Sequence, residues 1–255
     1  MKIQNPNMSG QHRAMIIDWI FRFDKMFEVS ADTYYIATGI IDRFISKLSV
    51  SRSQYQLVAL TSFYIACKFE EVYFPTVTDL VNICENLYSR ADFLSMEVLI
   101  LTTLKFDIGR PYSLQFLRRY SRAAKAGSRV HMMAKYFCEQ SLVYYQLAHI
   151  KPSIIAGAAI YLSLRLNREI ESPIIKKETS IWTPTLEHYS TYKRDQLIPY
   201  IELLAHIILD SENSKHQECR KKYSRPKCFE VAKLTMPMKR ILENYSQKVS
   251  RSPTD

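Results

Sequence analysis

The residues best suited to chemistry in this sequence are one lysine and three acids in its first half. Lys68 ends a long apolar segment, and Glu70 and Glu71 follow it, while Glu97 lies in the next apolar segment, residues 96–101. A lysine donates hydrogen bonds and a carboxylate accepts them. A charged pair at the rim of an apolar core can therefore bind the backbone of another protein chain, and the pattern predicts a docking site.

No catalytic constellation accompanies this pair. The six histidines form no i, i+4 pair with an acid between them, no glycine-rich phosphate loop occurs, and no serine has a Gly-x-Ser-x-Gly setting. The five cysteines are scattered and include no Cys-x-x-Cys pair that could supply a zinc site. The sequence predicts a non-enzyme without cofactor or metal that acts by binding.

Composition predicts a soluble chain of two globular domains. The 255 residues are 47% hydrophobic and 12% aromatic, which is enough for two cores. The most apolar stretch, residues 154–164, falls short of the ~18 residues that span a bilayer. The first residues show no apolar core of a secretion signal. We therefore expect a reduced intracellular protein, and both nucleus and cytoplasm remain open as its location.

Helices must position the charged pair, because the apolar pattern is helical throughout. Apolar residues recur at spacings of three and four, as in residues 15–23 and 35–44, and strand-like alternation is not sustained. Helix starts are marked by a polar residue with an acid or amide three positions later. These pairs are Ser51 with Gln54, Thr76 with Asp79, and Ser89 with Asp92. The fold class predicted is all-α, with five helices before Pro111.

The second half of the chain repeats the first. Residues 154–166 align with residues 57–69 at an offset of 97, with small, apolar, tyrosine and cationic positions in step. Each segment is apolar nearly all round, as is typical of a helix at a domain centre. Generic helical composition is the alternative explanation for a single aligned window. The repeat predicts a first domain at residues 1–109 and a second at 110–212.

A basic C-terminal extension is expected at residues 213–255. It holds eleven lysines and arginines against four acids, within a chain of net charge +10. Such a tail either stays solvated or contacts nucleic acid or a phosphorylated partner.

Several motifs, taken in order, resemble the cyclin box. They are residues 12–20, 41–46, 68–71 and 96–97. Residues 110–121, 134–136 and 152–158 resemble the second fold of mitotic B-type cyclins. The resemblance implies two tandem five-helix cyclin folds. It also implies a regulatory subunit that binds and activates a cyclin-dependent serine/threonine kinase at the G2/M transition.

The resemblance also implies roles for individual residues. Lys68 would donate to backbone carbonyls at the mobile helix of the kinase, and Glu97 would accept from neighbouring groups. The remaining kinase-binding positions are Phe69, Glu70, Leu101, Phe106 and Ile108. The alternative for Lys68 and Glu97 is an ordinary surface pair at a helix end. Arg13 and Asp42, on successive helices, are expected to form a structural ion pair, as the resemblance also implies.

A second docking surface is implied by residues that match the cyclin groove for Arg-x-Leu peptides of substrates and inhibitors. They are His12, Met15, Ile16, Trp19 and Gln56. His12 stands where methionine is usual, and Arg22 stands where an acid normally receives the cation of the peptide, so Arg22 would repel it. Ile16 is equally explained as a core residue.

Two other functions remain as alternatives. One is a transcriptional cyclin paired with a different kinase. The other is a nucleic-acid-binding protein like transcription initiation factor IIB, which also has tandem cyclin folds; its zinc ribbon needs a cysteine cluster near the N-terminus, and no cysteine precedes Cys67.

Overall fold

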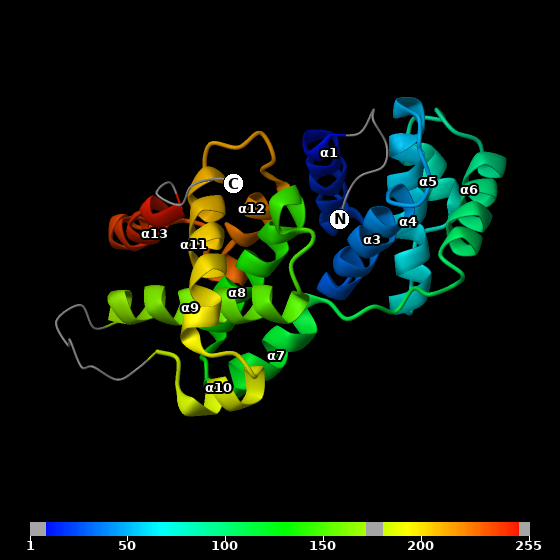
Figure 1. The fold of residues 1–255 in the computed structure, drawn as a ribbon. Coiled ribbons are helices and arrows are strands. Elements are labelled where there is room, and N and C mark those ends of the chain that lie inside the picture. Colours follow the sequence, from blue (N-terminus) through cyan, green and yellow to red (C-terminus); the bar gives the residue numbers. More distant parts are fainter. Residues whose placement is uncertain (1–8, 172–180, 250–255) are drawn as a thin grey trace. The chain divides into compact units, whose positions relative to one another are not determined.

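The computed structural model describes residues 9–171 and 181–249 (Figure 1). Within those residues the chain consists of helices and loops without a strand, which confirms the all-α prediction. The chain divides into two compact units, residues 1–110 and 111–255. No helix in the described part is long and apolar enough to cross a membrane.

The first unit is built around one central helix. Its helices are α1 (Gly10–Phe21), α2 (Asp24–Phe27), α3 (Ala31–Ile45), α4 (Tyr55–Glu70), α5 (Val77–Ile83) and α6 (Arg90–Thr103), with a 3-10 turn at Arg52–Gln54. Helix α4 packs against α1, α3 and α6. Ala59 and Ala66 of α4 are fully buried, and their small side chains allow neighbouring helices to approach closely. Besides the five helices expected before Pro111, the structure contains the four-residue α2.

The predicted helix starts are confirmed. Capping boxes are present at Ser51, Thr76 and Ser89. At Ser89, the hydroxyl accepts from the Asp92 backbone N–H at 3.2 Å, and the Asp92 carboxylate accepts from the Ser89 N–H at 2.7 Å. The same hydroxyl donates to this carboxylate, and these bonds lower the pKa of Asp92. The box fixes the residue at which α6, the helix that carries Glu97, begins.

Replacing Ser89 by alanine is expected to lower the free energy of unfolding by about 1 kcal/mol, because the cap satisfies backbone N–H groups that the helix leaves unpaired. Urea denaturation of the variant measures this loss. Ser95→Ala is the matched control, since Ser95 is exposed in the middle of α6 and alanine is the better helix former there. Equal stability of the two variants would contradict a capping role.

The second unit also surrounds a central helix. Its helices are α7 (Ser113–Ala123), α8 (Ser128–Val143), α9 (Pro152–Glu171), α10 (Pro184–Ser190), α11 (Arg194–Asp210), α12 (Glu218–Tyr223) and α13 (Met236–Val249), with 3-10 turns at Tyr145–Leu147 and Pro226–Cys228. Helix α9 packs against α7, α8 and α11. Helices α4 and α9 each begin two residues before the windows that align in the sequence. The two segments that align in the sequence therefore lie in the two central helices, one in each unit.

The residues after 213 include helices that pack on the second unit. Glu139 of α8 is completely buried and accepts from Lys222 Nζ at 2.9 Å and from the Tyr223 hydroxyl at 2.5 Å. Helix α13 packs along α11, and Lys239 of α13 pairs with Glu212 at 2.7 Å. A separate basic extension is therefore not shown, because some of its charges pair within the unit. The boundary expected between residues 212 and 213 stays a prediction.

Candidate functional site

Lys68 and Glu97 come together where α4 packs against α6. Lys68 lies in the last turn of α4 and Glu97 in the second half of α6, and Lys68 Nζ forms an ion pair with Glu97 Oε1. Glu97 is 8% exposed, whereas the Lys68 side chain is 34% exposed. Lys68 Nζ also lies 4.5 Å from the centre of the Tyr64 ring, one turn earlier, in a cation–π contact. The buried acid and the ring hold the ammonium group in place at the surface.

The two acids after Lys68 differ in their surroundings. Glu71 Oε1 accepts from the Ser30 backbone N–H at 2.7 Å and from the Thr33 hydroxyl. Those donors lie at the start of α3, where a negative charge also complements the helix dipole. Glu71 therefore fastens the end of α4 to the start of α3. Glu70 is exposed beside Lys68.

The apolar positions expected around the pair are partly exposed and partly buried. Phe69 and Phe106 are exposed, 54% and 68% respectively, and Leu101 is half-buried. Ile108 is only 7% exposed, so its side chain lies mainly in the core of the first unit. A Cβ atom at Gly109 would lie 3.3 Å from Phe69 Cζ, so glycine leaves room for the ring to lie over this loop.

Sequence reasoning missed several exposed apolar residues near the pair. On α6, Leu94 and Val98 are exposed and share one side of the helix with Leu101, at spacings of four and three. In the loop after α4, the exposed residues are Val72, Tyr73 and Phe74. The spacing of apolar residues did not reveal the exposed side of α6, because this helix is apolar on both its inner and its outer side. We define the apolar rim as the exposed residues Phe69, Val72, Tyr73, Phe74 and Phe106 together with Leu94 and Val98, which lie on the side of α6 that Leu101 shares.

The loop after α6 is pinned so that it presents Phe106. Lys105 and Phe106 both take left-handed backbone conformations, with φ of 53° and 56°. The Phe106 N–H donates to the Leu101 carbonyl at 2.9 Å, which closes the end of the helix. Arg43 of α3 donates to the carbonyls of Asp107 and Ile108. A bulky residue rarely adopts this conformation, so the surrounding bonds hold a strained loop.

The residues expected to form the peptide groove lie on α1 and at the start of α4. His12 is half-buried; its Nδ1 accepts from the Ser9 N–H at 3.2 Å, which caps α1, and its ring centre lies 5.9 Å from that of Tyr55. Met15 is exposed, and Ile16 is buried as a core residue. Trp19 is partly exposed and packs edge-on against Phe23, and Gln56 is half-buried on α4.

Arg13 and Asp42 join α1 to α3 through two parallel bonds. Arg13 Nε donates to Asp42 Oδ1 at 2.6 Å, and Arg13 Nη2 donates to Asp42 Oδ2 at 2.8 Å. Arg13 is 1% exposed and the Asp42 side chain 14% exposed. This two-pronged geometry is the strongest form of a guanidinium–carboxylate contact.

The described residues contain no group of three or more histidine, cysteine, aspartate or glutamate side chains placed to hold a metal ion. The five cysteines are all buried free thiols. Burial raises the pKa of Cys67 and of Cys138, so both remain protonated at neutral pH.

Comparison with protein families gives two matches in tandem. Residues 1–109 match the model of the cyclin N-terminal domain, and residues 111–237 match the model of the cyclin C-terminal domain. The chain belongs to the cyclin family. The two central helices, α4 and α9, lie one in each match. The second match extends through α12, beyond the expected boundary at 212.

This cyclin is related to B-type cyclins. It is 36% identical over 232 residues to a G2/mitotic-specific cyclin-B of Patella vulgata, covering 91% of this chain and 54% of that protein. It is 38% identical over 232 residues to the cyclin-B of Spisula solidissima, covering 91% of this chain and 52% of that protein. For cyclin-B1 of Oryzias latipes, the identity is 33% over 250 residues, covering 97% and 59%. The chain thus spans between half and three fifths of the length of these relatives.

Two solved structures share the fold of this cyclin. A viral cyclin from herpesvirus saimiri aligns with a TM-score of 0.66 at 18% identity, covering 78% of this chain and 85% of that chain. A chain of the CAK complex from Chaetomium thermophilum bound to ATP-gamma-S aligns with a TM-score of 0.58 at 17% identity, covering 96% and 81%.

Proposed function

We propose that this cyclin is a non-catalytic regulatory subunit that binds and activates a cyclin-dependent serine/threonine kinase of the mitotic type at the G2/M transition. The observation that supports it best is the Lys68–Glu97 ion pair set beside the apolar rim. The relation to cyclin-B proteins over more than nine tenths of the chain supports the mitotic assignment.

The geometry suits a docking role because Glu97 and Tyr64 orient the Lys68 ammonium group, while that group remains able to contact a partner. Glu97 and the Tyr64 ring hold Lys68, so little side-chain entropy is lost when the ammonium meets a partner. An ammonium has three N–H donors, and Glu97 engages part of that capacity. The rest can bond backbone carbonyls at a helix end of the kinase, where the carbonyls lack partners.

Activation would follow from position rather than from chemistry in this chain. Phosphoryl transfer in protein kinases requires a lysine–glutamate ion pair and a metal-binding aspartate of the kinase to be correctly placed. A cyclin that binds the active arrangement more tightly shifts the kinase toward it, by no more than the difference in affinity for the two states.

A charge placed in the apolar rim should weaken kinase binding without unfolding the chain. Val98→Asp is expected to lower the affinity for a mitotic cyclin-dependent kinase at least about tenfold, because a buried unpaired carboxylate is strongly disfavoured. Titration calorimetry measures the affinity. Leu87→Asp is the matched control, since Leu87 is 64% and Val98 62% exposed in the same unit. An equal effect of the two substitutions would contradict a specific surface on α6.

The proposal extends to Arg-x-Leu peptides of substrates or inhibitors, which would dock beside Met15 and Trp19. The exposure of Met15 supports it, whereas Arg22, exposed one turn after Trp19, disfavours a cationic peptide end. The alternatives remain a transcriptional cyclin and a nucleic-acid-binding tandem cyclin fold. Residence in both nucleus and cytoplasm also stays a prediction.

A further inference from the structure

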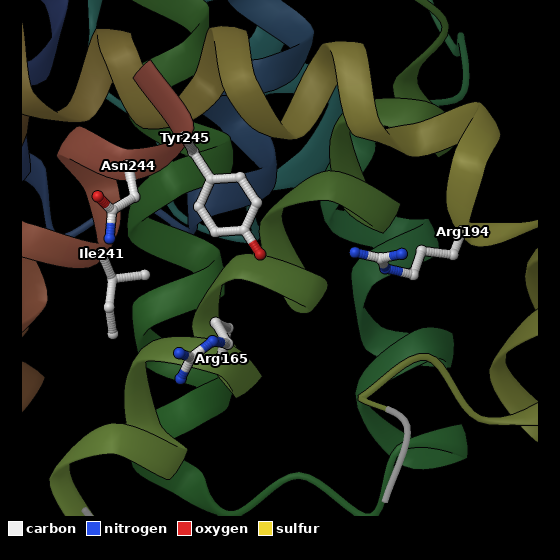
Figure 2. A pocket seen from close by; sticks show the side chains of 5 residues that line it. All are labelled: Arg165, Arg194, Ile241, Asn244 and Tyr245. Carbon is white, nitrogen blue, oxygen red and sulfur yellow. The ribbon is translucent and has the colours of Figure 1, made fainter. Parts of the chain in front are cut away.

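A cavity lined by two arginines and a tyrosine lies in the second unit. It has a volume of about 230 Å³ and is lined by Arg165 of α9, Arg194 of α11, and Ile241, Asn244 and Tyr245 of α13. Figure 2 shows the Arg194 guanidinium pointing toward the Tyr245 hydroxyl, with Arg165 beside the same space. Helices α9, α11 and α13 all pack against one another, so the cavity has a fixed frame.

The tyrosine hydroxyls at this cavity form hydrogen bonds with each other and with one of the arginines. Arg194 Nε donates to the Tyr161 hydroxyl oxygen at 3.2 Å, and the hydroxyls of Tyr161 and Tyr245 lie 3.4 Å apart. One of those two hydroxyls donates to the other, and the second O–H proton can donate to a further acceptor in the cavity. Burial raises the pKa of Tyr245, against the opposing effect of Arg165 and Arg194, so this hydroxyl stays protonated at neutral pH. An acceptor from outside the chain would complete the network.

The two arginines are only partly neutralised. Arg165 Nη1 donates to Glu169 at 3.0 Å, and its side chain is 32% exposed. Arg194 lies 3.9 Å from Asp195, which is 88% exposed, and such an exposed contact is weak. Each guanidinium has five N–H donors, and one carboxylate oxygen engages few of them. Several donors on two helices are therefore available to an anion.

We propose that this cavity binds the phosphate of a phosphorylated serine or threonine in a partner protein. A phosphate monoester carries close to two negative charges and three acceptor oxygens, which matches two guanidinium groups and a hydroxyl better than a single carboxylate does. Ile241 and the Tyr245 ring offer apolar contact for the carbon atoms next to the phosphate. The volume suits one such side chain.

The choice of partner rests on the proposed function. A subunit of a serine/threonine kinase meets proteins that carry this modification, because the kinase produces them. The cavity would then retain a substrate that has been phosphorylated once and favour its further phosphorylation. Phosphopeptide binding can be measured on this chain alone, without a kinase. The result of that measurement therefore does not depend on whether Lys68 and Glu97 bind a kinase.

The test is calorimetric titration of the full chain with an uncharged, end-blocked pentapeptide that carries phosphoserine at its centre. The unphosphorylated peptide, inorganic phosphate and a single-stranded oligonucleotide are titrated in parallel at one ionic strength, since exposed charges are screened by salt. We expect the phosphopeptide to bind at least about tenfold more tightly than the unphosphorylated peptide. Arg165→Gln and Arg194→Gln should each weaken it about tenfold, as the loss of a charge-assisted bond predicts.

Two further variants separate the cavity from general effects. Tyr245→Phe removes one hydroxyl and keeps the ring, and we expect a severalfold loss of phosphopeptide affinity with an unchanged melting temperature. Arg240→Gln removes an exposed arginine of α13 that does not line the cavity, and we expect less than a twofold change. Equal losses for Arg240→Gln and Arg194→Gln would overturn the proposal. The proposal would also be overturned if the phosphopeptide bound no more tightly than inorganic phosphate. It would be overturned, too, if the oligonucleotide bound more tightly than the phosphopeptide and the arginine variants abolished that binding.

Discussion

Replacing Lys68 and Glu97 together by alanine is expected to weaken binding to a mitotic cyclin-dependent kinase about 100-fold, with a proportional loss of activation at limiting concentration. Anchor residues at the centre of an interface each contribute 2 kcal/mol or more, and here one residue orients the other. The single substitutions should therefore not add up to the double one. Titration of the kinase with each variant measures the affinities.

The fold itself should tolerate this change. The double substitution removes both charges and leaves no buried carboxylate without its counter-charge, so the melting temperature should stay nearly constant. Glu230→Ala with Lys233→Ala is the matched control, because this pair is formed at 2.5 Å on the surface of the second unit. Kinase affinity unchanged in the Lys68 and Glu97 double variant would contradict the docking role of the pair.

Asp42→Ala is expected to destabilise the first unit by about 3 to 5 kcal/mol, because it leaves the buried Arg13 guanidinium without a counter-charge. Arg13 is 1% exposed and bonds Asp42 through two of its nitrogens, so water cannot readily replace the carboxylate. A urea unfolding curve of the variant should show an early transition for the first unit or no folded baseline.

A double variant identifies the cause of this loss. Arg13→Met with Asp42→Leu removes both charges and keeps apolar volume, so it should be clearly more stable than Asp42→Ala alone. Lys233→Ala, which breaks an exposed pair, should change stability by less than about 1 kcal/mol. A double variant as unstable as Asp42→Ala would show that packing around Asp42, rather than the stranded charge, sets the effect.

Local chemistry explains how far the fold followed from the sequence. The helix starts at Thr76 and Ser89 were predictable because a cap and its partner lie three residues apart, and each satisfies N–H groups of the other. The central helices α4 and α9 were predictable because they are apolar nearly all round. The packing of α12 and α13 was not, because it depends on the buried Glu139, whose partners Lys222 and Tyr223 lie 83 and 84 residues away.

The candidate site likewise contains residues that could be predicted from the sequence and residues that could not. Lys68 and Glu97 could be singled out by residue type and by resemblance, and the structure brings them together. Ile108 was expected as a contact position but is buried, whereas Val98, which was not singled out, is exposed. Helix α6 is apolar on both its inner and its outer side, so its apolar residues carry no periodic signal of which side faces solvent. That distinction arises from the packing of α6 on α4 and, less extensively, on α3 and α5.

The activity of a purified mitotic cyclin-dependent kinase toward histone, with and without this chain, tests the central claim most directly. We expect the initial rate to rise about 100-fold, as it would if a kinase that is active in about 1% of molecules became almost fully active. The rise should saturate at one chain per kinase. A kinase that neither binds this chain nor gains activity would contradict the account, and binding of duplex DNA that weakens steeply with salt would then favour the nucleic-acid-binding alternative.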